Sequence, residues 1–291
     1  MAYPHSNVKK DPWDMNPVQT ERLRGLLSTL GHDEEPMGMF YSDVEPEAGY
    51  SPKPGVLPGV EQESRNEVDW KGLWDNFSCM FGHLWLARRK RTAAYFSRER
   101  FGCLGCAFFL GFMKPQLNFI VHYVSTGIPG IIEGERYLDS PEATRQFYDM
   151  MDPEPAPGRF CVFKPVSQVT APDEPELVVF FARPEVISGL HQLATFVTGD
   201  FEAVCSPFGA GCANIVTWPL RYRAQGKVKA VLGGWDPSDR RFLKTDEITF
   251  TVPRAMFEQM LLRWDQSFLT TDTWRNIRKK VEKSRKTWDE V

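Results

Sequence analysis

The sequence lacks the short motifs that mark several common catalytic sites. It contains no Gly-x-Ser-x-Gly nucleophile turn, no His-Glu-x-x-His zinc motif and no glycine-rich lysine loop for phosphate. These absences argue against the usual serine hydrolases, zinc proteases and P-loop nucleotide hydrolases. Chemistry, if the chain performs any, has to come from other residues.

Strong charge and long apolar runs are also missing. The formal net charge is only -3 and the isoelectric point lies near 6.0, which argues against a dedicated nucleic-acid binder with a basic face. The most apolar stretch, 101–112, is too short to span a bilayer, and the first residues carry no signal-peptide core. We therefore expect no nucleic-acid partner, no membrane and a cytoplasmic location.

Two cysteine–glycine turns are the most informative feature that is present. Cys103-Leu-Gly-Cys106-Ala is one, and Cys205 followed by Gly-Cys212-Ala is the other. A C-x2-C spacing lets two sulfurs reach one metal across a turn, for which Gly105 is expected to permit a tight backbone. Soft thiolates suit iron–sulfur clusters and other metals. With one further cysteine on a predicted helix, the candidate metal and cofactor ligands are Cys79, Cys103, Cys106, Cys205 and Cys212.

Other interpretations of these thiols stay open. In a reducing cytoplasm the six cysteines are expected as thiols or ligands rather than as disulfides. Free cysteine is often a small buried hydrophobe, and Cys161, in an apolar run, fits that description. Cys103 or Cys106 could instead be the nucleophile of a metal-free thiol enzyme. A small-molecule binding or interaction module with structural cysteines is the third alternative, and the 21 Phe and 9 Trp would suit an aromatic pocket.

The order of the predicted elements indicates an α+β fold. We interpret it as two related strand-helix-strand halves that form mixed sheets packed with helices. In this alignment Phe40 matches Phe180, and Gly105 matches Gly211. The predicted segments are an N-terminal tail (1–16), a first half (17–151) with a Pro/Gly-rich insertion (45–66), a second half (152–268) and a C-terminal amphipathic helix (269–291).

Local signals place several elements within these halves. Asn16 and Pro17 begin a helix that Gly31 ends. An apolar strand is predicted over 177–182, and a hairpin is predicted from strands 220–224 and 228–232.

Two charged segments have a functional and a structural interpretation, and the structural one is favoured for both. The basic run that includes Arg88, at the end of the helix predicted over 70–88, could bind an anion or an acidic partner but is interpreted as a solvated last turn. The segment from Gly233 to Arg241 could contact a ligand phosphate, but it lacks the strand–glycine–helix context of a nucleotide loop and is interpreted as a turn.

Several short motifs together resemble an uncharacterised prokaryotic family, the domain of unknown function 169. The resemblance covers about residues 17–268. It is carried by 36–40, Cys79, 103–105 with 110–112, 134–138, the strand and helix beginning at 176–184, 212–213 with Pro219, and 246–247 ahead of Pro253. It implies a cytoplasmic protein, often from anaerobes, with Cys79, Cys103 and Cys212 as the family-like thiols. Cys106 departs from the family pattern.

These observations lead to one principal hypothesis. We expect a cytoplasmic redox or cofactor-binding protein that holds an iron–sulfur cluster or another metal through cysteines at the two turns. Its partner would be a small molecule or an electron-transfer protein, and its role electron transfer or reduction of that small molecule.

Overall fold

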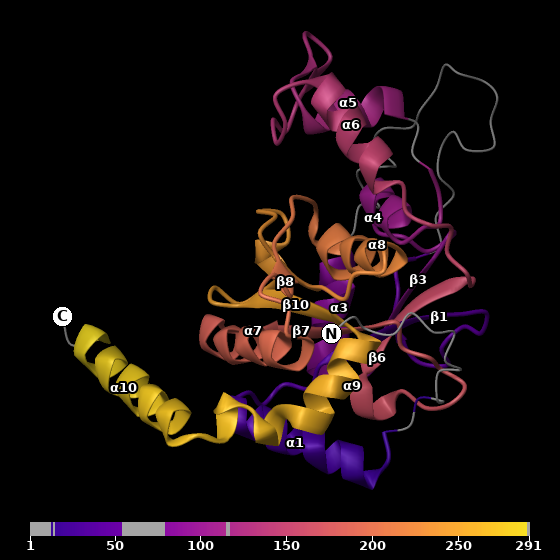
Figure 1. Ribbon diagram of the computed structural model, residues 1–291. Helices are drawn as coiled ribbons and strands as arrows, with labels where there is room; N and C mark the ends of the chain where they lie inside the picture. Colours follow the sequence, from indigo (N-terminus) through magenta and orange to yellow (C-terminus); the bar gives the residue numbers. More distant parts are fainter. Residues whose placement is uncertain (1–12, 14, 54–78, 115–116, 290–291) are drawn as a thin grey trace.

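The computed structural model describes residues 13, 15–53, 79–114 and 117–289 (Figure 1). Most of the predicted N-terminal tail and most of the 45–66 insertion lie outside the described residues. The predicted 70–88 helix is described only from Cys79 onward. The fold is α+β, as the sequence predicts.

One mixed sheet forms the centre of the molecule, with the strand order β2-β3-β6-β1-β7-β10-β9-β8. The strands of this sheet are β1 (Met37–Ser42), β2 (Gly49–Tyr50), β3 (Ala93–Ser97), β6 (Phe160–Pro165), β7 (Leu177–Ala182), β8 (Val204–Cys205), β9 (Ala230–Gly233) and β10 (Ile248–Pro253). β7 is buried along its whole length because helices cover both faces of the sheet.

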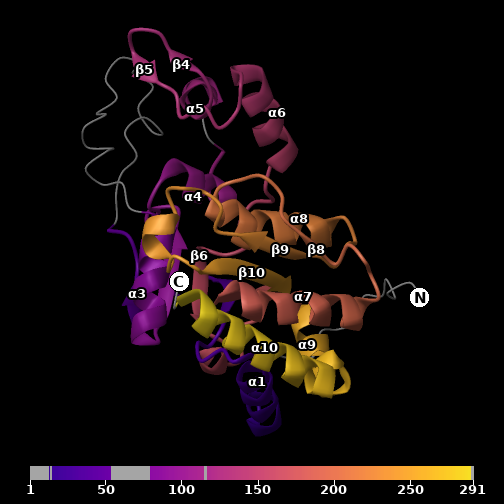
Figure 2. The same ribbon diagram turned by 90° about the vertical axis from the view of Figure 1, so that its left-hand side faces the viewer.

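The two faces carry separate hydrophobic cores. Val178 and Phe180 of β7 point to one core, which α1 (Pro17–Leu30), α7 (Pro184–Thr198) and α9 (Arg254–Arg263) cover. Val179 and Phe181 alternate to the other core, under α3 (Met80–Lys90), α4 (Leu104–Phe109) and α8 (Trp218–Ala224). Figure 2 shows the sheet between these two helical layers. Strand periodicity therefore decides which residues can reach a site on either face.

Helix α1 illustrates how local sequence fixes an element. The Asn16 side chain accepts a hydrogen bond from the Gln19 amide at 3.0 Å, and Pro17 occupies the first turn. Gly31 ends the helix in the left-handed conformation, with φ of 68°. Both predicted helix ends are confirmed.

The two ends of the sheet repeat one topology. Read from each edge to the centre, the strands run β2-β3-β6-β1 and β8-β9-β10-β7, each in the same chain order. The outer two strands are parallel in both groups, and the remaining pairs are antiparallel, including β1 with β7 at the centre. This arrangement makes β1 the counterpart of β7, as the alignment of Phe40 with Phe180 expects. The predicted division between residues 151 and 152 lies one strand before the topological division, which follows β6.

The repeat also relates two cysteines. Helix α3 lies between the second and third strands of its group, and the π-helical turn η2 (Ala213–Thr217), which continues into α8, lies between the second and third strands of the other. Cys79 is the N-cap of α3, and Cys212 is the N-cap of η2. Gly105 and Gly211 are not counterparts, because Gly105 follows the third strand of its group whereas Gly211 precedes the third strand of the other. The predicted hairpin strand over 220–224 is wrong, since these residues belong to helix α8.

Two further parts extend from this body (Figures 1 and 2). One is a lobe made of α5 (Leu117–Val124), the two-stranded β4–β5 sheet (Gly127–Ile128 and Ile132–Glu133) and α6 (Pro141–Met151). The other is the basic helix α10 (Asp272–Asp289), which the amphipathic pattern predicts over 269–291. Within the described part of the chain, no helix combines the length and hydrophobicity that crossing a membrane requires.

Candidate functional site

A cavity of about 540 Å³ lies between the lobe and the helical face of the body. The lobe contributes side chains from α5, α6 and the segment after β5, whereas the body contributes the start of α3, α4, the loop before η2 and the loop after β9. A cavity of this size suits a small molecule or a cofactor. Because it is built from seven separate segments, the fold has to form before the site exists.

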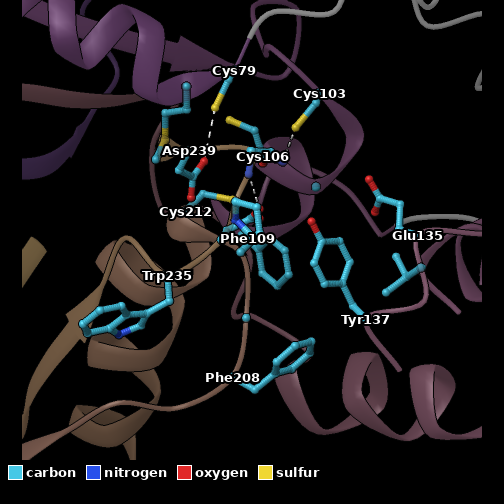
Figure 3. A pocket seen from close by; sticks show the side chains of 18 of the residues that line it. Cys79, Cys103, Cys106, Phe109, Glu135, Tyr137, Phe208, Cys212, Trp235 and Asp239 are labelled. Carbon is cyan, nitrogen blue, oxygen red and sulfur yellow. Dashed lines mark hydrogen bonds between the residues drawn. The ribbon is translucent and has the colours of Figure 1, made fainter. Parts of the chain in front are cut away.

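Four cysteines line one end of this cavity: Cys79, Cys103, Cys106 and Cys212. They come from three segments of the chain, and Figure 3 shows their side chains gathered around Asp239. Cys103 is the N-cap of α4, and its sulfur accepts a hydrogen bond from the Cys106 amide at 3.2 Å. The structure thus brings together four of the five cysteines that the sequence singles out.

Burial keeps these thiols protonated in the absence of a ligand. Desolvation raises the pKa of Cys79, Cys106 and Cys212, and neighbouring thiols raise it further. Asp239 adds to the increase for Cys79 and Cys212. Desolvation also raises the pKa of Cys103 to about 11, although amide hydrogen bonds from Cys106 and Gly105 oppose the increase. The four neutral thiols become thiolates only when a metal or another cation replaces their protons.

Asp239 is a buried carboxyl group at the same end of the cavity. Its residue is only 4% exposed, and its Oδ1 accepts a hydrogen bond from the Cys79 thiol at 3.5 Å. Oδ2 has no partner among the described residues at ordinary hydrogen-bond geometry. The nearby Gly211 amide nevertheless lowers the pKa of the carboxyl group. Burial raises the pKa of Asp239 to about 7, and the charge of Asp236 adds to this effect. Asp239 therefore places a carboxyl group that titrates near neutral pH among the cavity thiols.

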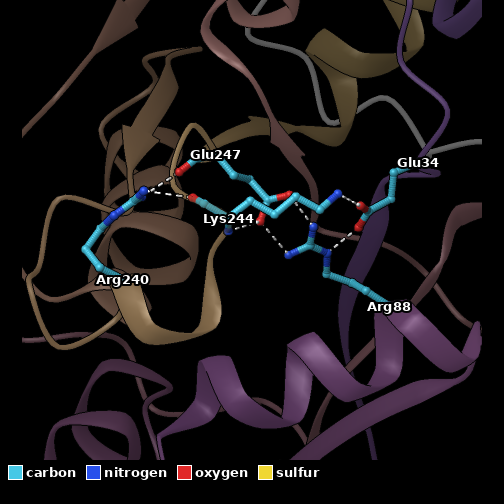
Figure 4. Close-up of polar contacts among 5 residues, drawn as sticks. All are labelled: Glu34, Arg88, Arg240, Lys244 and Glu247. Carbon is cyan, nitrogen blue, oxygen red and sulfur yellow. Dashed lines mark hydrogen bonds and ion pairs between the residues drawn. The ribbon is translucent and has the colours of Figure 1, made fainter.

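An ionic network holds the loop that carries Asp239 (Figure 4). Arg240 donates hydrogen bonds to the carbonyl oxygens of Gly234, Lys244 and Thr245, at 3.3, 2.9 and 2.7 Å. Glu247, at the far end of the loop, binds Arg88 of α3 through both oxygens at 3.1 and 2.6 Å. The same contacts therefore fix the loop and the helix that Cys79 caps relative to each other.

Arg88 lies at the centre of this network. It pairs with Glu34 as well, and its guanidinium stacks over the Phe181 ring at 3.9 Å from the centroid. Its side chain is only 6% exposed. The prediction of a solvated last turn is wrong for Arg88, because acidic partners from two distant segments neutralise it in the interior.

Aromatic rings make up much of the remaining wall. Tyr123, Phe147 and Tyr148 come from the lobe, whereas Phe208 and Trp235 come from the body. The Phe208 loop is held by Trp218, whose ring nitrogen donates to the Phe208 carbonyl oxygen at 2.8 Å.

Trp235 is oriented in a similar way. Its ring nitrogen donates a hydrogen bond to the Ser206 hydroxyl at 2.8 Å. The rings thus form a positioned apolar surface beside the thiols.

The two other cysteines lie outside the cavity. Cys205, on β8, donates a hydrogen bond from its sulfur to the Ala230 carbonyl oxygen at 3.3 Å, and it does not line the cavity. Cys161 is fully buried in β6 among core residues, as the sequence predicts. All six cysteines are free thiols.

Sequence reasoning missed the acidic members of the site. Asp239 belongs to the segment interpreted as a turn, and Glu135 lies after β5 in the lobe. One signal in the sequence could have indicated these residues. The predicted turn combines Trp235 and Asp236 with glycines, which allow the backbone to approach a ligand closely. The predicted tight backbone at Gly105 is wrong: Gly105 has an ordinary helical conformation inside α4 and no positive φ.

The positions of the thiols restrict the kind of metal site that they could form. Among the described residues, no group of three or more His, Cys, Asp or Glu side chains is placed to hold a single metal ion. Sulfurs that share one zinc ion all lie about 2.3 Å from it. An iron–sulfur cluster instead takes its cysteines at separate iron atoms. The donor set, made only of thiols and one carboxyl, is chemically suited to such a cluster.

The molecule is therefore an α+β protein with a duplicated sheet topology and a thiol-lined cavity. A family model, the domain of unknown function 169 described as uncharacterised ArCR, matches residues 25–263. The match spans most of the 291-residue chain, so the chain belongs to this family, as the sequence motifs predict. No curated protein and no solved structure matches the chain.

Proposed function

We propose that this protein is a cytoplasmic redox protein that holds an iron–sulfur cluster at the thiol end of the cavity. Cys79, Cys103 and Cys212 are the principal ligands, and Cys106 is the fourth. The observation that carries the proposal is the convergence of these four thiols, from three segments of the chain, on one end of one cavity. Cys205 is not included, because it lies outside the cavity.

Several features of the site support a cluster. The four thiols pack in the hydrophobic core under α3, α4 and α8 and also border the cavity, so a bound cofactor could reach all of them. The amide hydrogen bond to the Cys103 sulfur, at 3.2 Å, is of the kind that tunes the potential of cluster sulfurs. The surrounding aromatic rings limit solvent access, which also affects the potential. The topological repeat adds that Cys79 and Cys212 occupy equivalent helix starts.

The remaining cavity volume supports a role in reducing or carrying electrons to a small molecule. A cluster occupies only part of about 540 Å³, and the aromatic wall leaves room for a second molecule beside it. Six free thiols and no disulfide suit a reducing compartment, which supports the cytoplasm as the location.

Anaerobic purification tests the proposal. We expect brown protein with iron and acid-labile sulfide near stoichiometric amounts, and a broad absorption in the visible range. Cys79→Ser, Cys103→Ser and Cys212→Ser should each lose most of the iron. Cys161→Ser and Cys205→Ser are matched controls outside the cavity and should keep it. Colourless, iron-free protein, or equal iron loss in the controls, would contradict the proposal.

A second candidate, a metal-free small-molecule binding module, is favoured by the cavity itself. Its volume and aromatic walls need no metal to bind a ligand. In that case replacing the four cavity thiols by serine should leave ligand affinity unchanged in a folded protein. Loss of affinity without unfolding would exclude this candidate.

A further inference from the structure

The part of the cavity away from the thiols carries carboxyl groups and exposed rings, and this combination selects a class of ligand. Figure 3 shows Phe208 opposite the thiols, Trp235 on one side, and Tyr137 and Glu135 on the other. Phe208 is 48% exposed, Trp235 53% and Tyr137 39%. Exposed rings that gather along one cavity, unlike rings scattered singly over a surface, are typical of a ligand-binding groove.

Negative charges predominate along the cavity wall, both in this region and at the thiol end, where Asp239 lies. Glu135, Asp236 and Asp239 line the cavity, and Arg241 is the cation among its lining residues. Within the described part of the chain, no lysine or arginine forms an ion pair with any of the three carboxyl groups. The Arg241 guanidinium lies over the Phe242 ring, 4.7 Å from its centroid, and its charge offsets only part of the raised pKa of Asp239.

Two of the carboxyl groups are oriented by the cavity wall. Glu135 accepts a hydrogen bond from the Tyr123 hydroxyl at 3.0 Å, so one oxygen is fixed and the group is held at the wall. Asp239 is nine-tenths buried, lines the same cavity and has one oxygen without a partner among the described residues. An unpartnered buried oxygen is costly unless a donor reaches it. A ligand with a positively charged or N–H donating group would supply that donor.

We propose that the cavity binds a flat aromatic molecule that carries a positive charge or a protonated nitrogen. The ring lies against Phe208 and Trp235, where the faces of the aromatic side chains also attract a cation. The charged nitrogen lies toward the carboxyl groups of the cavity, Glu135 and Asp236 away from the thiols and Asp239 at the thiol end. The inference deepens the proposed function and rests on it in one respect. This ligand is the small molecule that would lie beside the cluster.

A charge series on one ring tests the ligand class. The probes are 1-naphthylmethylammonium, 1-naphthalenemethanol and 1-naphthoate, which share a ring system and differ in charge. Calorimetric titration of the anaerobically purified full chain should give the ammonium an affinity about tenfold above that of the carboxylate, the size of one favourable ion pair over none. The neutral alcohol should lie between them. Equal affinities, a preference for the carboxylate, or no binding of any probe at millimolar concentration would overturn the inference.

Matched variants assign the binding to this cavity. Glu135→Gln and Asp236→Asn should each reduce the preference for the ammonium by severalfold while leaving the affinity for the alcohol unchanged. Glu133→Gln changes an exposed carboxyl group two residues away that does not line the cavity, and it should bind like the wild type. A preference that survives both cavity variants would place the charge recognition elsewhere and overturn the inference.

Removing an aromatic ring should lower the affinity for all three probes and leave the preference for the ammonium unchanged. Phe208→Ala should weaken all three probes by a similar factor, because it removes apolar contact rather than charge. Phe201→Ala is the control, since Phe201 is 94% exposed and lies outside the cavity. Circular dichroism should first show that each variant is folded.

Iron and sulfide content, measured on the same samples, separates this inference from the proposed function. Cation preference in iron-free protein would leave the inference standing and remove the cluster. A full complement of iron with no cation preference would remove the inference alone.

Discussion

The sulfur of Cys79 donates a hydrogen bond to Oδ1 of Asp239 at 3.5 Å, although the two residues are 160 positions apart in the sequence. The contact joins the start of α3 to the loop after β9, and it places a carboxyl group among buried thiols. Desolvation and the charge of Asp236 raise the pKa of this group, and the charge of Arg241 opposes them only in part. The protonation of this carboxyl group and the hydrogen bonding of its second oxygen, Oδ2, then depend on what occupies the cavity.

The first prediction concerns the pH dependence of stability that Asp239 causes. Burial raises the pKa of this carboxyl group from 3.8 to about 7. Between these values the folded protein keeps a proton that the unfolded chain has released. The free energy of unfolding should therefore fall as the pH rises from about 4 to about 7 and then level off, by up to about 4 kcal/mol for a shift of three pKa units.

Asp239→Asn should remove this fall, because the amide does not ionise. Urea unfolding of the wild type and the variant, from pH 4.5 to 8, gives the difference between the two stability curves. Asp246→Asn, at an exposed position of the same loop, should give a curve parallel to that of the wild type. A parallel curve for Asp239→Asn as well would show that Asp239 ionises normally.

Local sequence signals predicted the elements well, whereas contacts between distant residues decided the site. Helix α1 and strand β7 follow from an N-cap, a C-terminal glycine and a run of apolar residues. Asp239 could not be assigned in this way, because its burial results from Cys79 and Gly211 in other segments. The same is true of Arg88, whose partner Glu247 is 159 positions away.

The thiols show what a sequence motif can predict and what it cannot. The two cysteine–glycine turns drew attention to cysteines that do line the cavity, since each turn precedes or begins a helix on the same face of the sheet. The motif could not separate Cys205 from Cys212. Their difference arises because Cys205 lies on a short edge strand that pairs with β9, and Cys212 caps the following helical turn.

The second prediction concerns the reactivity of the cavity thiols. Desolvation raises the pKa of Cys103 to about 11, compared with about 8.5 for a cysteine in an unfolded chain. The thiolate is the reactive form, so iodoacetamide should label native Cys103 at pH 7.5 about two orders of magnitude more slowly than the same residue in urea. Labelling followed by peptide mass spectrometry measures both rates. Rapid labelling of native Cys103 or Cys106 would instead favour a thiol enzyme.

The third prediction concerns the Arg88 network. Arg88→Met should lower the free energy of unfolding by about 3–5 kcal/mol, because it leaves the buried Glu247 carboxylate without its partner. Arg89→Met, at the exposed next position of α3, should change it by less than about 0.5 kcal/mol. The double variant Arg88→Met/Glu247→Gln should recover part of the loss. Urea unfolding measures these proteins together with the single variant Glu247→Gln, and additive losses in the double variant would show that the two side chains are not coupled.

The fourth prediction compares the two glycines of the repeated Gly-Cys-Ala tripeptide, which the sequence treats as equivalent. A Cβ atom at Gly211 would collide with Oδ2 of Asp239 and with the Phe81 ring, both of which lie in tightly packed surroundings. At Gly105 the nearest atom, the Cys103 sulfur, would be 3.8 Å away, an ordinary contact. Gly211→Ala should therefore destabilise the fold by about 1–3 kcal/mol, whereas Gly105→Ala should be neutral or stabilise α4 by up to about 1 kcal/mol. Thermal and urea unfolding of the two variants test the difference. Equal stabilities would mean that the loop carrying Asp239 can move away from Gly211, and the buried position of that carboxyl group would then not be fixed by the backbone beside it.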